Sequence, residues 1–105
     1  MNKMKLLIVT CISEHVQIAT EILKKARINI FSTNDTIGRK IVQPINLSEN
    51  WFGKIGEQYD SVVLFSFTDE LNAANTLSLV NEKNVEMLSD YPIHAFILPV
   101  ESASD

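Results

Sequence analysis

The chain is predicted to adopt an α+β, ferredoxin-like βαββαβ fold, with a four-stranded antiparallel sheet and two helices on one face. One observation behind this is the order of elements: an apolar run, an amphipathic helical segment and a second strand-like run occur twice in succession. The other is length, because 105 residues suit one such domain spanning 1–105. The fold leaves one face of the sheet without helices, and we expect subunit association to cover it.

The first half-unit begins with a strand over 5–12, whose continuous apolar stretch 6–9 is typical of a strand buried on both faces. A helix is predicted over about 13–27, because apolar residues recur there at three- and four-residue spacing. These residues are Val16, Ala19, Ile22, Leu23 and Ala26. Ser13 is the candidate N-cap of this helix.

A second strand is predicted over 28–37, with Ile28 and Ile30 on one face and a bulge or bend at Asn34 and Asp35. The pattern then decays between 41 and 59, where Pro, Asn and Gly residues are scattered among apolar side chains. A connection of about twenty residues is long for a compact domain and is more often functional. We therefore expect a functional loop at about 41–59.

The second half-unit repeats the first. A strand is predicted over 61–67 and a helix over about 69–83, with Thr68 or Asp69 as its N-cap. Its inward-facing stripe is predicted to consist of Leu71, Ala74, Leu77 and Val80.

Asn84 is the candidate C-cap of the second helix, and 85–91 is expected to connect it to the last strand. That strand is predicted over 92–100, beginning at Pro92. The remaining residues, 101–105, are small and polar and are expected to form a frayed tail.

Composition narrows the function classes. A net charge of −4 argues against a nucleic-acid binder, which normally carries a basic face. The single cysteine, Cys11, excludes an intramolecular disulfide and suits a reducing compartment. No apolar run reaches the length of a membrane span. The apolar run 6–12 is short for a signal peptide and no small-x-small cleavage site follows it, so we expect a cytoplasmic protein.

Few residues are candidates for catalysis or metal binding. Cys11 and His15 are four positions apart and are candidate ligands of a soft metal, but two ligands make an incomplete site. A buried cysteine and a histidine in the solvated first helical turn explain them better, so no metal site is predicted. No nucleophile and general base form a recognisable pattern, so no catalytic residue is predicted and the chain is not expected to be an enzyme. Nor does the sequence indicate a particular cofactor.

Gly38, Arg39 and Lys40 form the candidate ligand site. A glycine allows close approach of the backbone to a ligand, and two adjacent cations can meet phosphate or carboxylate oxygens. Trp51 and Phe52, in the expected loop, are candidates for contact with a ligand or protein partner.

The segments 26–30 and 36–40 resemble part of a known protein family. Ala-Arg-Ile-Asn-Ile at 26–30, leading to Thr-Ile-Gly-Arg-Lys at 36–40, resembles the first half of PII-type signalling proteins, and the second half-unit fits their second half. The resemblance implies a homotrimer with ligand clefts between its subunits. It would place Gly38–Lys40 at the base of a mobile loop, facing a cleft, where a small anionic ligand binds. The loop, with Trp51 and Phe52, would report ligand state to a protein partner.

One departure from the family concerns 84–91, which contains no glycine and only acidic charge. Nitrogen-regulatory PII proteins have a glycine-rich segment there that holds ATP phosphates. The chain is therefore more similar to the divergent PII-like branch, whose members bind other small ligands or have none assigned.

A ligand-responsive regulator is the first hypothesis for the function, and three alternatives to it stay open. One is an interaction module that senses no small ligand. Another is a trimeric metal-binding protein of the divalent-cation-tolerance type, which would use Cys11 and His15. The last is a dimeric ferredoxin-like enzyme, for which His94 is the candidate polar group.

Overall fold

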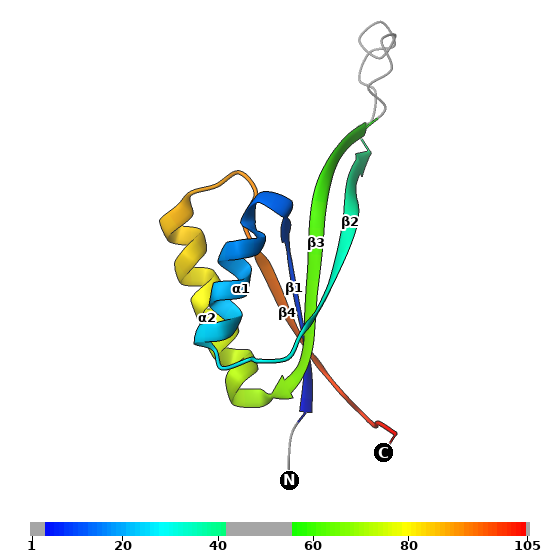
Figure 1. The fold of residues 1–105 in the computed structure, drawn as a ribbon, viewed down its shortest axis with the longest axis vertical. Coiled ribbons are helices and arrows are strands. Elements are labelled where there is room, and N and C mark those ends of the chain that lie inside the picture. Colours follow the sequence, from blue (N-terminus) through cyan, green and yellow to red (C-terminus); the bar gives the residue numbers. More distant parts are fainter. Residues whose placement is uncertain (1–3, 42–55, 105) are drawn as a thin grey trace, which may run out of the picture.

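The computed structural model describes residues 4–41 and 56–104, which form two helices packed on one face of a four-stranded sheet (Figure 1). The strand order is β2-β3-β1-β4, and all neighbouring strands are antiparallel. The elements are β1 (Met4–Ile12), a 3-10 turn (Ser13–His15), α1 (Val16–Lys25), β2 (Ser32–Ile41), β3 (Gly56–Asp69), α2 (Glu70–Met87) and β4 (His94–Pro99). The predicted ferredoxin-like fold is confirmed.

The core lies between the sheet and the helices. Leu7 and Val9 of β1 and Leu64 of β3 point toward the helix layer and are almost completely buried. The predicted inward stripe of α1 is confirmed, since Ala19, Ile22, Leu23 and Ala26 are buried and Val16 packs against the core. The predicted N-cap is wrong: Ser13 begins the 3-10 turn, and no side chain caps that turn.

The end of α1 explains why β2 begins later than predicted. Arg27 has a left-handed backbone, with φ of 64°. Its N–H donates to Lys24 O at 3.0 Å, and the N–H of Ile28 donates to Leu23 O at 2.9 Å. This is the hydrogen-bond pattern of a Schellman motif, in which Ile28 and Leu23 also pack together in the core.

The strand predicted over 28–37 is therefore wrong at both ends, because β2 spans Ser32–Ile41. Ile28 is buried whereas Ile30 is 85% exposed, so the two do not share a face as predicted. The predicted bulge at Asn34 and Asp35 is also absent, because β2 and β3 pair without interruption from Ser32–Phe65 to Ile41–Gly56. Both polar residues are exposed, as an edge strand allows.

The β2–β3 hairpin extends past the ends of the helices (Figure 1). The loop predicted over 41–59 is too wide, because Ile41 still belongs to β2 and β3 already begins at Gly56. β2 and β3 remain paired up to Ile41 and Gly56, although glycines such as Gly38 and Gly56 usually weaken a strand. The residues between these two strands lie outside the described part of the chain.

The second helix is longer than predicted, and its predicted inward stripe is only partly confirmed. Asp69 is its N-cap, as predicted, and its carboxylate accepts the N–H of Asn72 at 2.7 Å. The helix passes Asn84 and runs to Met87, so the predicted C-cap is wrong; Leu88 ends it with a left-handed φ of 50°. Of the predicted inward stripe, Val80 is buried and Leu77 packs against the core, whereas Leu71 and Ala74 are exposed. Ala73 and Thr76 are buried in their place.

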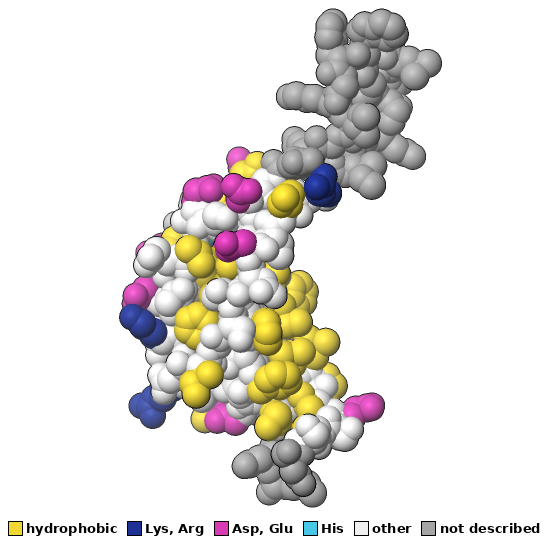
Figure 2. Space-filling view, turned by 45° about the vertical axis from the view of Figure 1, so that its right-hand side comes forward, with side chains coloured by type: hydrophobic (Ala, Val, Ile, Leu, Met, Phe, Trp, Pro, Cys, Tyr) yellow, Lys and Arg dark blue, Asp and Glu magenta, His cyan; other side chains and the backbone are white. Residues whose placement is uncertain are grey.

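The opposite face of the sheet carries no helix. Alternation places Leu6, Ile8, Val63, Phe65, Phe67, Phe96 and Leu98 on this open face. Phe67 is 59% exposed and Phe96 is 52% exposed. Figure 2 shows hydrophobic side chains gathered on this side of the molecule. Within one chain β1 is thus buried on its helix side only. Neither described helix combines the length and apolar character needed to cross a membrane.

Candidate functional site

The predicted ligand residues lie within the regular part of the β2–β3 hairpin. Gly38 pairs with Tyr59, Arg39 with Gln58 and Lys40 with Glu57. Gly38 is on the open face, and Arg39, exposed, is on the opposite face. The side chain of Lys40 lies outside the described residues. All three residues thus lie in β2, in the part of the hairpin that extends past the helices, which we call the hairpin root. The side chains of neighbouring residues alternate, so Gly38 and Arg39 face opposite sides of the sheet.

Gly38 has a packing role that the sequence did not indicate. A Cβ added at Gly38 would overlap the ring of Tyr59, which lies across the glycine on the open face. The same ring is 6.0 Å, centroid to centroid, from the ring of Tyr91, which precedes β4, and the two planes are tilted by 52°. Aromatic residues often cover a glycine on the neighbouring strand. Recognising such a pair from sequence requires knowing which residues of the two strands are opposite each other, and the sequence did not indicate this.

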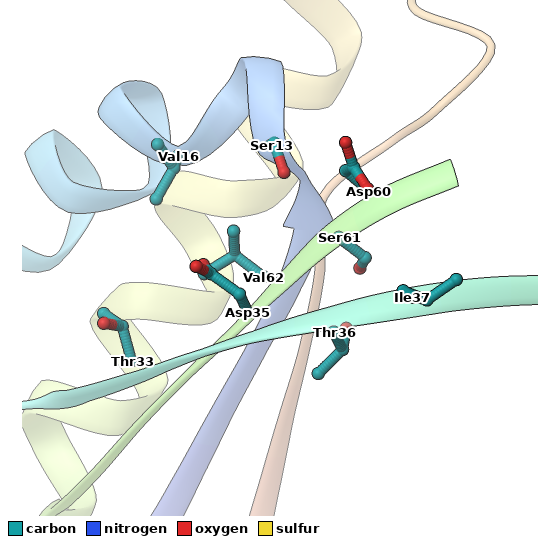
Figure 3. A pocket seen from close by; sticks show the side chains of 9 residues that line it. All are labelled: Ser13, Val16, Thr33, Asp35, Thr36, Ile37, Asp60, Ser61 and Val62. Carbon is teal, nitrogen blue, oxygen red and sulfur yellow. The ribbon is translucent and has the colours of Figure 1, made fainter. Parts of the chain in front are cut away.

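Two cavities flank this part of the sheet. The larger, of about 570 Å³, lies on the helix side, between the start of the helical layer and the hairpin (Figure 3). Its lining residues come from three places: Ser13 and Val16; Thr33, Asp35, Thr36 and Ile37; and Asp60, Ser61 and Val62. Figure 3 shows Asp35 and Val62 pointing from the sheet toward the helices. With two carboxylates and no basic residue among its described lining, this cavity does not favour an anion.

The smaller cavity, which we name the tyrosine pocket, has a volume of about 230 Å³. It lies where the last residues of β1 and the first half of β3 meet the segment before β4. Thr10, Cys11, Ile12, Tyr59, Ser61, Asp90, Tyr91, Pro92 and His94 line it. The Tyr59 ring forms part of its wall and also covers Gly38, so the pocket adjoins the predicted ligand residues. Neither Tyr59 nor Tyr91 was a predicted site residue.

The candidate metal ligands do not gather a third ligand among the described residues. Within this part of the chain, no group of three His, Cys, Asp or Glu side chains is placed to hold a metal ion. Cys11 is buried on the helix side of β1, and this burial raises the pKa of its thiol. A raised pKa disfavours the thiolate that metals bind. The Nδ1 atom of His15 is buried and has no hydrogen-bond partner among residues 4–41 and 56–104.

Trp51 and Phe52, the predicted contact residues for a partner, lie outside the described residues. His94, the residue named for an enzyme alternative, is exposed and stacks on Phe96 with ring centroids 6.4 Å apart. It lines the tyrosine pocket beside Tyr91 and Asp90.

Comparison by sequence finds no matching family model and no matching curated protein. Comparison by structure finds several. A PII-like signalling protein from Thermus thermophilus has a TM-score of 0.65 and 16% identity, over 94% of this chain and 88% of that one. Bacillus subtilis GlnK, in complex with ATP, has a TM-score of 0.68 and 9% identity, over 94% and 84%.

A third match is CPII of Thiomonas intermedia, a nitrogen regulatory PII-like protein bound to ADP, AMP and bicarbonate. Its TM-score is 0.59 and its identity 12%, over 96% of both chains. At such identities the likeness concerns the fold, and it extends over almost the whole chain. The strand order, the helix layer and these three matches agree: the chain has the fold of the PII-like signalling proteins.

Proposed function

We propose that this chain is a non-enzymatic, PII-like regulatory protein that responds to a small anionic ligand. One observation carries the proposal: the fold matches, over 94% and 96% of this chain, GlnK in complex with ATP and CPII bound to ADP, AMP and bicarbonate. All of these ligands are anions. A regulator needs its ligand-binding residues close to a segment that a protein partner contacts. We propose that the segment 42–55, which follows Gly38–Lys40 closely in the sequence, has this role.

The ligand would bind at the root of the β2–β3 extension. Arg39 is exposed there, and the described residues offer it no ion-pair partner. An exposed guanidinium can form bidentate hydrogen bonds with phosphate or carboxylate oxygens. Gly38 faces the other side of the sheet and would act indirectly, because it makes room for the Tyr59 ring and so shapes the hairpin on which Arg39 lies.

The open sheet face supports the proposed homotrimer. Its exposed aromatic side chains include Phe67 and Phe96, which are unfavourable to leave in water. Closed, symmetric association of three copies would cover them and would create clefts between subunits. In this arrangement the ligand would lie in a cleft, in keeping with the family resemblance.

Signalling would follow from a difference in ligand affinity between two states of the protein. A ligand shifts an equilibrium only by as much as it prefers one state. We propose that ligand at Arg39 and Lys40 favours one arrangement of the segment 42–55, and that a protein partner contacts Trp51 and Phe52 within it. The cytoplasm is the proposed location.

Isothermal titration calorimetry of the intact chain tests the proposal, with ATP, ADP, AMP and bicarbonate as separate probes. The variant R39A/K40A is expected to lose binding of whichever anion the wild type binds. The matched control is K24A/K25A, which removes two exposed cations from α1 and is expected to bind normally. Equal affinity in wild type and R39A/K40A would refute the placement of the site, and no saturable binding of any anion would refute the sensing function.

A further inference from the structure

The tyrosine pocket has a chemistry opposite to that of the proposed anion site. Asp90 is the only carboxylate among the described residues lining the pocket, and no lysine or arginine accompanies it. Its other polar and aromatic lining consists of the Thr10 hydroxyl, the Ser61 hydroxyl, which donates to Cys11 O, the imidazole of His94, and the side chains of Tyr59 and Tyr91. The electrostatic potential of such a lining attracts positive charge.

The two aromatic rings present accessible faces. Tyr59 is 40% exposed and Tyr91 is 49% exposed, although their centroids are only 6.0 Å apart. The faces of aromatic rings carry negative electrostatic potential. Cations are attracted to such faces within about 6 Å of the centroid.

The local backbone holds these rings in place. Tyr59 lies over Gly38, where any larger residue would overlap it. On the other side, the N–H of Tyr91 donates to Ser89 Oγ at 3.0 Å. Two residues later, Ile93 is completely buried and bonded through its backbone to α2. The pocket is thus largely formed before any ligand enters, which lowers the entropic cost of binding.

We propose that the tyrosine pocket binds a small organic cation, such as an alkylguanidinium or quaternary ammonium group. The cation would lie against the rings of Tyr59 and Tyr91, with its charge balanced by Asp90. The volume of about 230 Å³ is smaller than that of a typical drug-sized site, so the pocket suits a compact ligand or one cationic group of it. The pocket lies at the edge of the open sheet face, because Thr10, Tyr59, Ser61 and His94 all project from that face. In the proposed homotrimer it would border a cleft between subunits. The inference goes beyond the anion-sensing function.

Titration of the isotopically labelled wild-type chain with tetramethylammonium chloride, followed by two-dimensional NMR, tests the proposal. Sodium chloride at equal ionic strength is the reference, and sodium acetate is the anionic probe. Saturable shifts are expected for the amides of Tyr59 and Tyr91 with tetramethylammonium. Methylguanidinium chloride at the same low concentrations should give a similar pattern, and acetate should leave these amides unchanged.

Two variants remove the cation-binding groups separately. D90N, at an exposed position, and Y91L are each expected to weaken binding about fivefold, as expected for one partly solvated contact. D35N is the matched control, because it removes a carboxylate from the other cavity and should bind as the wild type does. Unchanged melting temperature of D90N shows that its loss is not unfolding.

The proposal is overturned if the wild type shows no saturable cation effect beyond sodium chloride, or if D90N and Y91L bind as tightly as D35N. Binding of acetate at these amides in place of the cation would also overturn it. R39A/K40A is expected to retain cation binding. Its behaviour separates this proposal from the anion site, since that variant can lose anion binding while the tyrosine pocket remains intact.

Discussion

The side-chain amide of Asn84, in α2, binds both backbone groups of Ile93, just before β4. Its Nδ2 donates to Ile93 O at 2.8 Å, and its Oδ1 accepts the N–H of Ile93 at 2.9 Å. Ile93 is 1% exposed, so water cannot replace these bonds. The side-chain amide of Asn84 therefore pairs with the backbone of Ile93 as a neighbouring strand would, and it joins the last turns of α2 to the segment before β4.

Replacing Asn84 by alanine is expected to destabilise the fold by about 2 kcal/mol, because a buried N–H and C=O lose their partners together. Urea unfolding measures the difference. N81A, which removes an exposed asparagine from the same helix, is the control and should change the free energy of unfolding by less than about 0.5 kcal/mol. Identical midpoints for N84A and N81A would show that the two hydrogen bonds contribute nothing.

A second prediction concerns the end of α1. Arg27 occupies the left-handed position of a Schellman motif, where glycine is usual, with φ of 64°. Because a Cβ in this region is disfavoured by about 1–2 kcal/mol, R27G is expected to raise stability, by up to about 1 kcal/mol after the greater entropy of unfolded glycine is deducted. The measurement is the thermal or urea midpoint.

K24G supplies the comparison for R27G. Lys24 is exposed and lies inside α1, where glycine is expected to cost about 1 kcal/mol. The same substitution should therefore have opposite signs three residues apart. A decrease in stability for both variants would contradict the role assigned to the left-handed backbone of Arg27.

The same motif shows where sequence reasoning reached its limit. The stripe of α1 was predictable because its apolar residues follow one helical period. The segment after it was assigned to a strand because Ile28 and Ile30 alternate with polar residues. In the structure Ile28 belongs to the same buried cluster as Leu23, and the carbonyl of Ile30 accepts a hydrogen bond from Ser66 Oγ at 2.7 Å. A positive φ at an arginine leaves no mark in the sequence.

The second helix illustrates a different difficulty. The apolar spacing predicts Leu71 in the buried stripe, yet Leu71 is 69% exposed and Thr76 is completely buried. The hydroxyl of Thr76 is satisfied within the helix, because it donates to Asn72 O at 2.9 Å. A threonine can then occupy a core position without an unpaired polar atom. Hydrophobic pattern alone does not identify such a position.

The candidate site was predictable only in part. Gly38, Arg39 and Lys40 lie in β2, and their role in ligand binding stays a prediction. The role of Gly38 in seating Tyr59, and the contact of Tyr59 with Tyr91, depend on residues brought together by the sheet. Their long separation along the chain conceals this relationship until the register of β2 and β3 is known.

A third prediction concerns Cys11. Burial raises the pKa of its thiol above the ordinary value of 9.0. The folded state thus holds the proton to a higher pH than the unfolded chain does, and the stabilisation is fully present below the unfolded pKa and is lost as the pH rises through the folded pKa. We expect the free energy of unfolding to fall as the pH rises above the ordinary thiol value of 9.0, more steeply for the wild type than for C11A.

The comparison for Cys11 uses slopes, because C11A also leaves a cavity that lowers stability at every pH. Other groups that titrate in this range are common to both proteins and cancel. Parallel curves of stability against pH would show that the thiol does not contribute. The same burial predicts slow alkylation of Cys11 by iodoacetamide in the folded state, with fast alkylation in urea.

The last prediction tests the open sheet face. With the proposed homotrimer, light scattering on a sizing column should give about three times the chain mass of 11.8 kDa. F96D places a charge among the exposed aromatic residues of this face and is expected to yield monomers, since an unpaired charge buried in an interface is strongly unfavourable. L71D is the control: Leu71 is 69% exposed but lies on α2, away from the open face, so this variant should assemble normally. A wild-type monomer would contradict the assembly, and a trimer unaffected by F96D would mean that association uses another surface.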